Sequence, residues 1–304
     1  MEHRRIGSLE VSVIGLGCNN FGWRLDADAT AKVVDAAIDA GVDFFDTAEL
    51  YGEGRSEEYI GRALRGRRQD VIIATKFGHK SGHPGRGGSP DNVHRAIEGS
   101  LKRLGTDYID LYQLHSPDPR VPVADTLGAL DELKRAGKVR EIGCSNFSAT
   151  ELREADASVE PGHARFVSVQ NEYSLINRDP EADVLPECER LGIAFIPYYP
   201  LASGLLTGKY RRGKPAPQGT RISHDSGMLS DESLATVEEL AHFAEGKGHT
   251  LLQLAMGWLL AHPAVASVIA GATKPEQVRD NAMAASWKLS PQERAAVDAL
   301  AVYS

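Results

Sequence analysis

The feature that most constrains the fold is a regular alternation of short apolar runs with amphipathic segments along all 304 residues. Each run is rich in Val, Ile, Phe or Tyr, and such runs are typical of strands buried on both faces of a parallel sheet. Eight of them stand out, at 11–17, 42–48, 71–77, 108–115, 139–147, 166–173, 192–199 and 266–273. Helical patterns lie between them, at 28–40, 56–64, 90–104, 123–136, 180–191, 250–261 and 275–285. This order predicts an α/β fold with a parallel sheet.

Eight is also the number of strands that closes a (β/α)8 or TIM barrel, although the count alone leaves an open doubly wound sheet as an alternative. Two features favour the barrel. No change of composition divides the chain, and GLGCNNFG at 15–22 does not fit the GxGxxG fingerprint of dinucleotide-binding open sheets. We therefore predict a single TIM-barrel domain over residues 1–304.

The net charge and the length of the apolar stretches limit the classes of partner to expect. The formal net charge of −8 gives no reason to expect a nucleic-acid-binding protein, which normally presents a basic face. The longest apolar stretch, 251–261, is too short for a bilayer, which takes ~20 residues. The first residues lack the apolar core of a secretion signal, and the three cysteines are scattered without a CxxC pair. These features predict a cytoplasmic protein with reduced thiols and no membrane attachment.

Polar residues at the ends of the apolar runs are the candidates for chemistry. In a parallel barrel the carboxyl ends of all strands meet at one rim, where active sites form. A single strand-end Asp is commonly a helix cap, and a single His is commonly a hydrogen-bonded core residue. A convergent set instead indicates a site, and its members are Asp46, Lys76, His115, Ser145, Asn146, Gln170 and Asn171.

Tyr51 lies five residues beyond Asp46 and is a candidate general acid. A phenol has a pKa of about 10, and a neighbouring ammonium lowers it because it favours the phenolate. Lowering it toward 7 requires ~4 kcal/mol of differential interaction, much of which Lys76 can supply if Asp46 keeps it charged. His115 can then orient a carbonyl oxygen or relay the proton. The alternative is a half-buried loop tyrosine next to the turn glycines Gly52 and Gly54.

Metal-dependent and serine-based chemistry lack support. His79 and His83 are four residues apart, but in a Gly-rich loop rather than on a helix, and neither HExxH nor GxSxG occurs. A metal-dependent isomerase would need more strand-end ligands than Asp46 and His115. A second loop, 207–230, is rich in Lys and Arg and would lie at the same rim, so we expect it to be functional.

Several segments together resemble the aldo-keto reductase superfamily over nearly the whole chain. They are GLGCNNFG (15–22), GVDFFDTAELYGEGRSEEYIG (41–61), VIIATKFG (71–78), LKRLGTDYIDLYQLHSPD (101–118), GKVREIGCSNF (137–147), SVQNEYSLINR (168–178), IPYYPLASGLLTGKY (196–210) and VIAGATKPEQVRDN (268–281). The resemblance implies a (β/α)8 barrel with NAD(P)H extended across its C-terminal face. It also implies a tetrad, in which Tyr51 is the general acid, Lys76 and Asp46 tune it, and His115 positions the substrate.

The resemblance also implies how the cofactor is held, from one end to the other. The nicotinamide carboxamide would contact Ser145, Asn146 and Gln170. The aromatic stacked on the nicotinamide ring would be Tyr198, whose alternative role is that of a core aromatic. The pyrophosphate-side loop would supply Leu201, Ser203, Gly204 and Lys209. The adenosine end would contact Gly271, Thr273, Gln277, Asp280 and Asn281. The expected cations for a 2′-phosphate are Lys209, Arg221 and Lys274, whose alternative role is that of solvated surface charges.

Two departures from the family pattern affect specificity. Some branches carry Lys and Arg where this chain has Gly271 and Gln277, but other branches with this Gly/Gln pattern still take NADPH. NADPH is therefore the expected cofactor, with NADH as the alternative. Asn19 and Asn20 replace the Thr and aromatic of many members, and the expected substrate-side residues are Asn19 and Trp23. The alternative for Trp23 is a structural anchor of its loop.

The resulting functional prediction is NADPH-dependent reduction of an aldehyde or ketone to an alcohol, with a small carbonyl compound as the partner. The alternative within the family is a regulatory subunit that binds the cofactor and turns over slowly, as some channel-associated members do. The complete tetrad favours the enzyme. The family implies a monomer, although its Gly/Gln branch includes oligomers.

Overall fold

The computed structural model describes residues 1–79, 87–214, 216, 222 and 229–301. His83 and Arg221 therefore lie outside the described residues. Within the described part, an eight-stranded parallel sheet follows the order of the chain, except that its last strand lies beside its first. Its strands are β3 (Ile14–Gly17), β4 (Phe44–Asp46), β5 (Ile72–Phe77), β6 (Ile109–Leu114), β7 (Val139–Ser145), β8 (Ser168–Glu172), β9 (Ala194–Tyr198) and β10 (Val268–Gly271).

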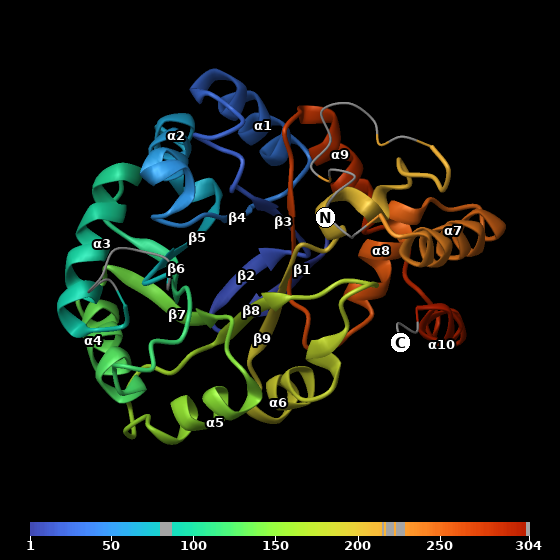
Figure 1. The fold of residues 1–304 in the computed structure, drawn as a ribbon. Helices are drawn as coiled ribbons and strands as arrows, with labels where there is room; N and C mark the ends of the chain where they lie inside the picture. The colour runs from blue at the N-terminus through green and yellow to red at the C-terminus, as the bar shows by residue number, and fades with distance from the viewer. Residues whose placement is uncertain (80–86, 215, 217–221, 223–228, 302–304) are drawn as a thin grey trace.

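The sheet closes into a barrel between β9 and the segment that leads into β10. The amide of Phe195 donates to the carbonyl of Ala264 at 2.7 Å, and the amide of Ala266 donates to the carbonyl of Phe195 at 3.0 Å. Figure 1 looks down this barrel, with the helices arranged around the strands. The predicted TIM barrel is therefore confirmed, and all eight predicted runs contain a barrel strand.

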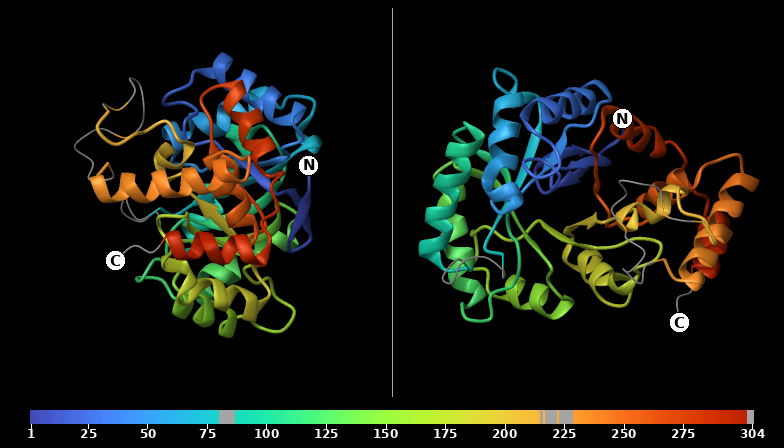
Figure 2. Two further views of the ribbon diagram at one scale, coloured as in Figure 1. Left: turned by 90° about the vertical axis from the view of Figure 1, so that its right-hand side faces the viewer. Right: turned by 45° about the horizontal axis from the view of Figure 1, so that its top comes forward.

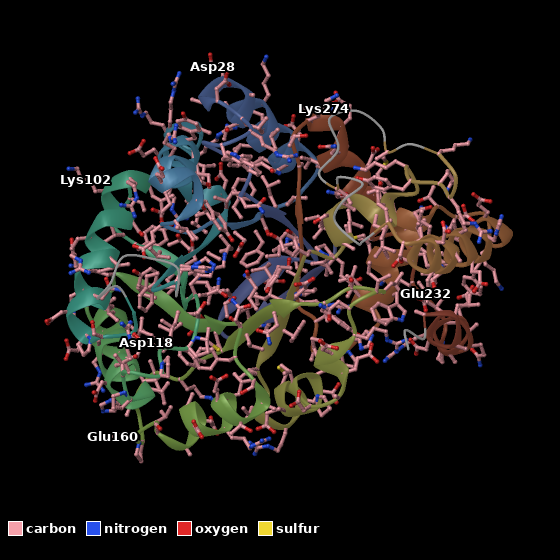
Figure 3. The ribbon with its side chains drawn as sticks, in the orientation of Figure 1. Asp28, Lys102, Asp118, Glu160, Glu232 and Lys274 are labelled. Atoms are coloured by element: carbon pink, nitrogen blue, oxygen red, sulfur yellow. The ribbon has the colours of Figure 1, made fainter. Side chains whose placement is uncertain are left out.

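Helices cover the outside of the barrel, and their polar faces point outward, as the labelled Asp28 and Lys102 show in Figure 3. The predicted helical segments correspond to α1 (Ala27–Asp39), α2 (Arg55–Ala63), α3 (Pro90–Leu104), α4 (Val123–Arg135), α6 (Val184–Leu191), α8 (Leu251–Leu260) and α9 (Pro275–Ala284). The predicted segment 180–191 differs most clearly, because a separate short turn, η3 (Asp179–Glu181), precedes α6.

The sequence reading missed three helices, α5 (Ala149–Ala157), α7 (Asp231–Gly246) and α10 (Pro291–Leu300). Two of them begin at capping boxes, in which Ser148 pairs with Glu151 and Ser290 pairs with Glu293. A Ser followed three residues later by Glu is a recognisable helix start, so the signal was present in the sequence.

The first apolar run, 11–17, is divided between two sheets. β1 (His3–Ile6) and β2 (Leu9–Ser12) form an antiparallel hairpin before the barrel strand β3 begins. Three hairpin side chains, Ile6, Leu9 and Val11, pack with the interior barrel residues Phe44, Ala74, Leu111, Ile196 and Ile269. The side view in Figure 2 shows the hairpin beside the N-terminal label and the gold η4 (Ala202–Thr207) region toward the opposite side. The hairpin thus closes the end of the barrel opposite the carboxyl ends of the strands.

Every second residue of a strand faces the barrel interior, and this pattern continues to the rim formed by the carboxyl ends of the strands. Side chains two residues apart point to the same face of a strand. Phe44 and Ala74 belong to the interior cluster, so Asp46 and Lys76 also face the barrel axis, one layer nearer the carboxyl end. The same step leads from Leu111 through Gln113 to His115. Packing of the barrel core therefore fixes the direction in which these side chains point.

Gly15 offers a test of how tightly the interior is packed. A Cβ at this position would lie 2.8 Å from Phe44 Cδ1 and 2.8 Å from Ile269 Cγ2. We expect Gly15→Ala to lower the free energy of unfolding by about 1–3 kcal/mol, measured by urea denaturation, because both neighbours belong to a packed core.

The matched control is Gly128→Ala on the exposed face of α4, where a new Cβ meets nothing within 4 Å. That change should raise stability by about 0.5–1 kcal/mol, because Gly in a helix interior is less favourable than Ala. Equal stability of the Gly15 variant and the natural chain would contradict the packing argument.

Candidate active site

A buried ion pair lies at the centre of the site. Lys76 is fully buried at the end of β5, and its Nζ donates to Asp46 Oδ2 at 2.7 Å and to the Thr47 carbonyl at 2.8 Å. The other carboxylate oxygen of Asp46 accepts a hydrogen bond from Gln170 Nε2 at 2.8 Å. A buried charge is tolerated when it is paired and hydrogen-bonded. Asp46 therefore holds a cation in the barrel interior.

Tyr51 approaches this cation through a tight turn. The 3-10 segment η1 (Tyr51–Gly54) contains Gly52 and Gly54 at φ 56° and 91°. A Cβ on Gly52 would lie 2.8 Å from the Phe21 carbonyl oxygen, so this close approach requires glycine. Lys76 Nζ lies 5.2 Å from the centroid of the Tyr51 ring. The turn therefore places the phenol beside the buried ammonium.

His115 completes the cluster from the end of β6. Its ring lies edge-on to that of Tyr51, with centroids 6.0 Å apart, and 4.6 Å from the ring of His79. Burial lowers the pKa of His115 to about 2, and the positive charges of Lys76 and His79 contribute further. Within the described part of the chain, its buried Nδ1 has no hydrogen-bond partner. The imidazole is therefore neutral near pH 7 and acts as a hydrogen-bonding group rather than a cation.

A hydrogen-bonded chain links the ends of β7, β8 and β9 beside this cluster. The Tyr198 hydroxyl donates to Asn146 Oδ1 at 2.8 Å, and Asn146 Nδ2 donates to the His115 carbonyl at 2.9 Å. The Ser145 hydroxyl donates to the Gln170 carbonyl at 2.7 Å. Burial, together with the charge of Glu172, raises the pKa of Tyr198 to about 12, so this phenol stays protonated. These hydrogen bonds fix the amide and phenol groups in one orientation.

A cavity of about 680 Å³ runs from this cluster across the rim. The predicted site residues that line it are Asn19, Asp46, Tyr51, His115, Ser145, Asn146, Gln170, Tyr198, Leu201, Ser203, Gly204, Lys209, Gly271, Thr273, Lys274, Gln277 and Asn281. Lys76 is fully buried and is not a lining residue. Asp280 and Trp23 are also not lining residues, and Trp23 is 64% exposed. Arg221 lies outside the described residues.

Sequence reasoning missed several lining residues, among them Asn20, Arg24, Leu50, His79 and Tyr199. Each lies within two residues of a strand end or of a predicted site residue, so proximity in sequence was the only available signal. Asn20 has a structural part as well, because its Nδ2 donates to the Ala272 carbonyl at 3.3 Å and ties the loop after β3 to the loop after β10.

The far end of the cavity carries two lysines. In the described part of the chain neither Lys209 nor Lys274 has an ion-pair partner. Lys209 Nζ lies close to the backbone of η4, since a Cβ on Gly204 would be 2.7 Å from it. Lys274 precedes α9, as labelled in Figure 3, and next to it the Thr273 amide donates to Gln277 Oε1 at 2.7 Å. Lys274, at the start of α9, and Lys209, after η4, are therefore unpaired cations that suit an anionic ligand.

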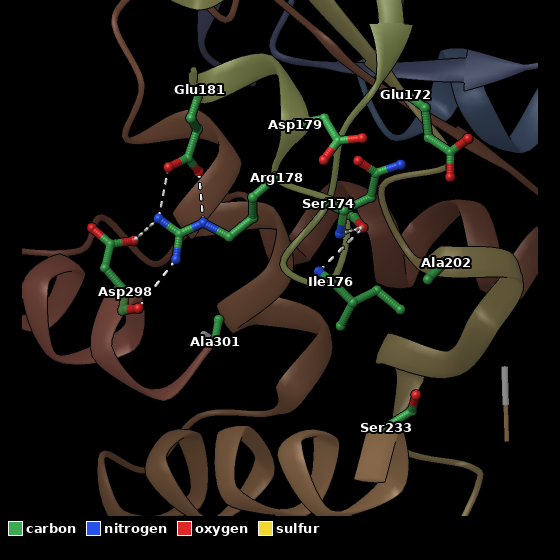
Figure 4. A pocket seen from close by; sticks show the side chains of 11 residues that line it. Glu172, Ser174, Ile176, Arg178, Asp179, Glu181, Ala202, Ser233, Asp298 and Ala301 are labelled. Carbon is green, nitrogen blue, oxygen red and sulfur yellow. Dashed lines mark hydrogen bonds and ion pairs between the residues drawn. The ribbon is translucent and has the colours of Figure 1, made fainter. Parts of the chain in front are cut away.

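A second cavity, also of about 680 Å³, lies between the loop after β8 and α10 (Figure 4). Its single arginine, Arg178, donates to both oxygens of Glu181 at 2.7 and 2.8 Å and lies 3.2 Å from Asp298. The Tyr173 hydroxyl also donates to Glu181 at 2.8 Å. These charges satisfy one another and fasten α10 to the barrel, and no tetrad residue lines this cavity.

Among the described residues, no group of three or more His, Cys, Asp or Glu side chains is arranged to hold a metal ion. No helix in the same part of the chain is long and apolar enough to cross a membrane.

Comparison with known proteins identifies the class of protein to which this barrel belongs. The family model described as "Aldo/keto reductase family" matches residues 13–302. The chain belongs to the aldo/keto reductase family and is an NAD(P)H-dependent oxidoreductase.

Individual relatives agree with this assignment. The chain is 35% identical to the aldo-keto reductase YhdN of Bacillus subtilis (strain 168), with 97% of this chain and 92% of that one covered. It is 36% identical to a probable voltage-gated potassium channel subunit beta of Oryza sativa subsp. japonica, with coverage of 92% and 90%. Its fold matches the glycerol dehydrogenase AKR11B4 from Gluconobacter oxydans with a TM-score of 0.86, 32% identity and coverage of 98% and 94%.

Proposed function

We propose that this protein reduces an aldehyde or ketone to an alcohol with NADPH, using Tyr51 as the general acid. The observation that carries the proposal is the convergence of three side chains. Tyr51 and the neutral His115 line one cavity, and the ammonium of the buried Lys76 lies 5.2 Å from the centroid of the Tyr51 ring. When bound, NADPH supplies a hydride to the carbonyl carbon. The protein must then supply a proton to the carbonyl oxygen.

Tyr51 donates that proton from its phenolic hydroxyl and becomes a phenolate, which solvent later reprotonates. The ammonium of Lys76 favours the phenolate electrostatically, and Asp46 keeps Lys76 charged inside the barrel. His115 offers the substrate oxygen a neutral hydrogen-bonding group, so it orients the carbonyl without competing as an acid.

The residues around the cavity fit an extended dinucleotide. Ser145, Asn146 and Gln170 present hydroxyl and amide groups beside the tetrad, as a carboxamide requires. Lys209 and Lys274 supply unpaired positive charge at the other end, as phosphates require. All these groups come from one chain, so a single subunit contains every residue that the proposal uses.

The direct experiment follows NADPH consumption with a panel of aldehydes and ketones and identifies the alcohol formed. Alcohol produced in equal amount to the NADPH consumed supports the proposal. Tight binding of NADPH without turnover of any carbonyl would contradict it and would favour the slow, regulatory role.

The cofactor preference makes a separate prediction. Lys274→Met should weaken binding of NADPH about tenfold and leave binding of NADH unchanged, because only NADPH carries the extra phosphate for a charge-assisted hydrogen bond. Fluorescence titration measures both affinities. Lys102→Met, on the outer face of α3, is the matched control and should change neither (Figure 3). Equal weakening of both cofactors would place Lys274 at a group that they share.

A further inference from the structure

The mouth of the active-site cavity has an apolar rim. Leu50 and Tyr199, each 41% exposed, line the cavity, and the 64% exposed Trp23 adjoins the lining residue Arg24. Tyr199 has a positive φ of 51°, a conformation that L residues rarely adopt and that tertiary contacts must hold. Exposed apolar side chains gathered at one concave site indicate a binding surface. The rim therefore favours a substrate with an apolar body.

One cation interrupts this rim. The guanidinium of Arg24 lies 4.8 Å from the centre of the Trp23 ring, and among the described residues it has no ion-pair partner. The loop that carries it is fixed, because the amides of Arg24 and Leu25 both donate to the Asn20 carbonyl, at 2.9 and 3.1 Å. A positioned arginine stacked on an aromatic ring keeps its donors available for a ligand.

The charge balance of the cavity favours an anion. Although the chain carries a formal net charge of −8, the one acidic side chain among the described lining residues is Asp46, and Lys76 neutralises it. A cation in such a concave site attracts negatively charged ligands. Arg24 is therefore not occupied by a carboxylate of the protein itself.

The loop of Arg24 lies on the Tyr51 side of the cavity. It packs against the turn of Tyr51, since a Cβ on Gly52 would contact Phe21 and Gly22. The two lysines suited to cofactor phosphates, Lys209 and Lys274, instead follow β9 and β10. The loop of Arg24 is also tied to the segment after β10, where Asn20 Nδ2 donates to the Ala272 carbonyl at 3.3 Å. Its contact with the turn of Tyr51, beside the reacting group, is what favours a substrate role for Arg24.

We propose that the substrate is an apolar aldehyde or ketone that carries a carboxylate, and that Arg24 determines this specificity by binding the carboxylate. The inference rests on the proposed reductase function and names its substrate class. The apolar body lies on the rim of Trp23, Leu50 and Tyr199, the carbonyl oxygen faces Tyr51, and the carboxylate accepts hydrogen bonds from the guanidinium.

The test compares para-formylbenzoate with its methyl ester, which differ by one charge. In Arg24→Gln, kcat/KM for the carboxylate should fall about tenfold or more, whereas that for the ester should stay within about twofold, as expected for loss of a charge-assisted hydrogen bond. Dividing each kcat/KM by that of the natural chain cancels the difference in intrinsic reactivity between the two compounds. Arg24→Lys should recover part of the lost selectivity. Arg65→Gln, an exposed arginine after α2, is the matched control and should leave both substrates unchanged.

Three results would overturn the assignment of Arg24. Equal losses for both substrates together with weaker NADPH binding would place Arg24 on the cofactor. Unchanged values for both would remove it from the substrate. An increase in selectivity for the carboxylate would show that the charge opposes binding.

A binding measurement separates this inference from the proposed function, because it needs no turnover. Calorimetry with para-(hydroxymethyl)benzoate and the NADP⁺-loaded protein should show binding that Arg24→Gln weakens about tenfold. Binding that depends on Arg24 without any carbonyl reduction would contradict the proposed function but support the anion site. Affinity that Arg24→Gln leaves unchanged would overturn the anion site, even if the protein is an active reductase.

Discussion

Tyr51→Phe is expected to lower kcat for carbonyl reduction by about 10²–10⁴-fold, which is the usual contribution of a general acid. The change removes the phenolic oxygen and keeps the ring that lies against Lys76 and His115. Neither neighbouring candidate can replace it. His115 is neutral because burial and adjacent positive charge lower its pKa to about 2, and the Tyr198 proton is engaged by Asn146, with a pKa raised to about 12.

The measurement is steady-state NADPH oxidation with the best substrate of the panel, accompanied by fluorescence titration of NADPH. Cofactor affinity should stay within about threefold, because the loss concerns the transition state rather than the ground state. Tyr59→Phe on the outer helix α2 makes the same chemical change away from the cavity and should leave kcat unchanged. If kcat of the Tyr51 variant stays within tenfold of the natural chain, another group donates the proton.

Lys76→Met is expected to impair both stability and catalysis. Removing one partner of a buried ion pair leaves the other charge uncompensated and typically lowers the free energy of unfolding by about 3–5 kcal/mol. Here Asp46, 2% exposed, would retain only the hydrogen bond from Gln170 among the side-chain contacts described above. Activity should fall by at least about 10²-fold, because the phenolate of Tyr51 would lose its stabilising ammonium.

A second substitution separates these two effects. Adding Asp46→Asn to Lys76→Met removes the uncompensated carboxylate, so urea denaturation should show part of the lost stability recovered. The reductase activity should not recover, because neither change restores a positive charge beside Tyr51. Recovery of activity along with stability would contradict the electrostatic role of Lys76 and reduce it to a structural one.

Local patterns in the sequence predicted the architecture well for a physical reason. Continuous apolar runs and 3.6-residue periodicity depend on which face of each element is buried, so they predict strands and helices directly. Parallel strands gather their carboxyl ends, so Asp46, Lys76 and Gln170 could be placed at one rim before any contact was known. The helix starts at Ser148 and Ser290 were present as capping boxes and were overlooked.

The N-terminal hairpin shows a limit of such patterns. The run 11–17 is apolar throughout, and nothing local indicates that β2 ends at Ser12 and that a barrel strand begins at Ile14. The division depends on what covers the open end of the barrel, where Leu9 and Val11 pack against residues from distant strands.

The amino-acid sequence by itself determined the alternation of strands and helices, the barrel, the family and the identity of the polar residues at the strand ends. Only the tertiary structure decided how those residues meet. It gave Asp46 a second partner in Gln170, made His115 neutral, and placed Arg24 rather than Trp23 in the cavity wall. The reason is that secondary structure follows from neighbouring residues, whereas burial, charge pairing and cavity shape depend on groups that closure of the barrel brings together from distant parts of the chain.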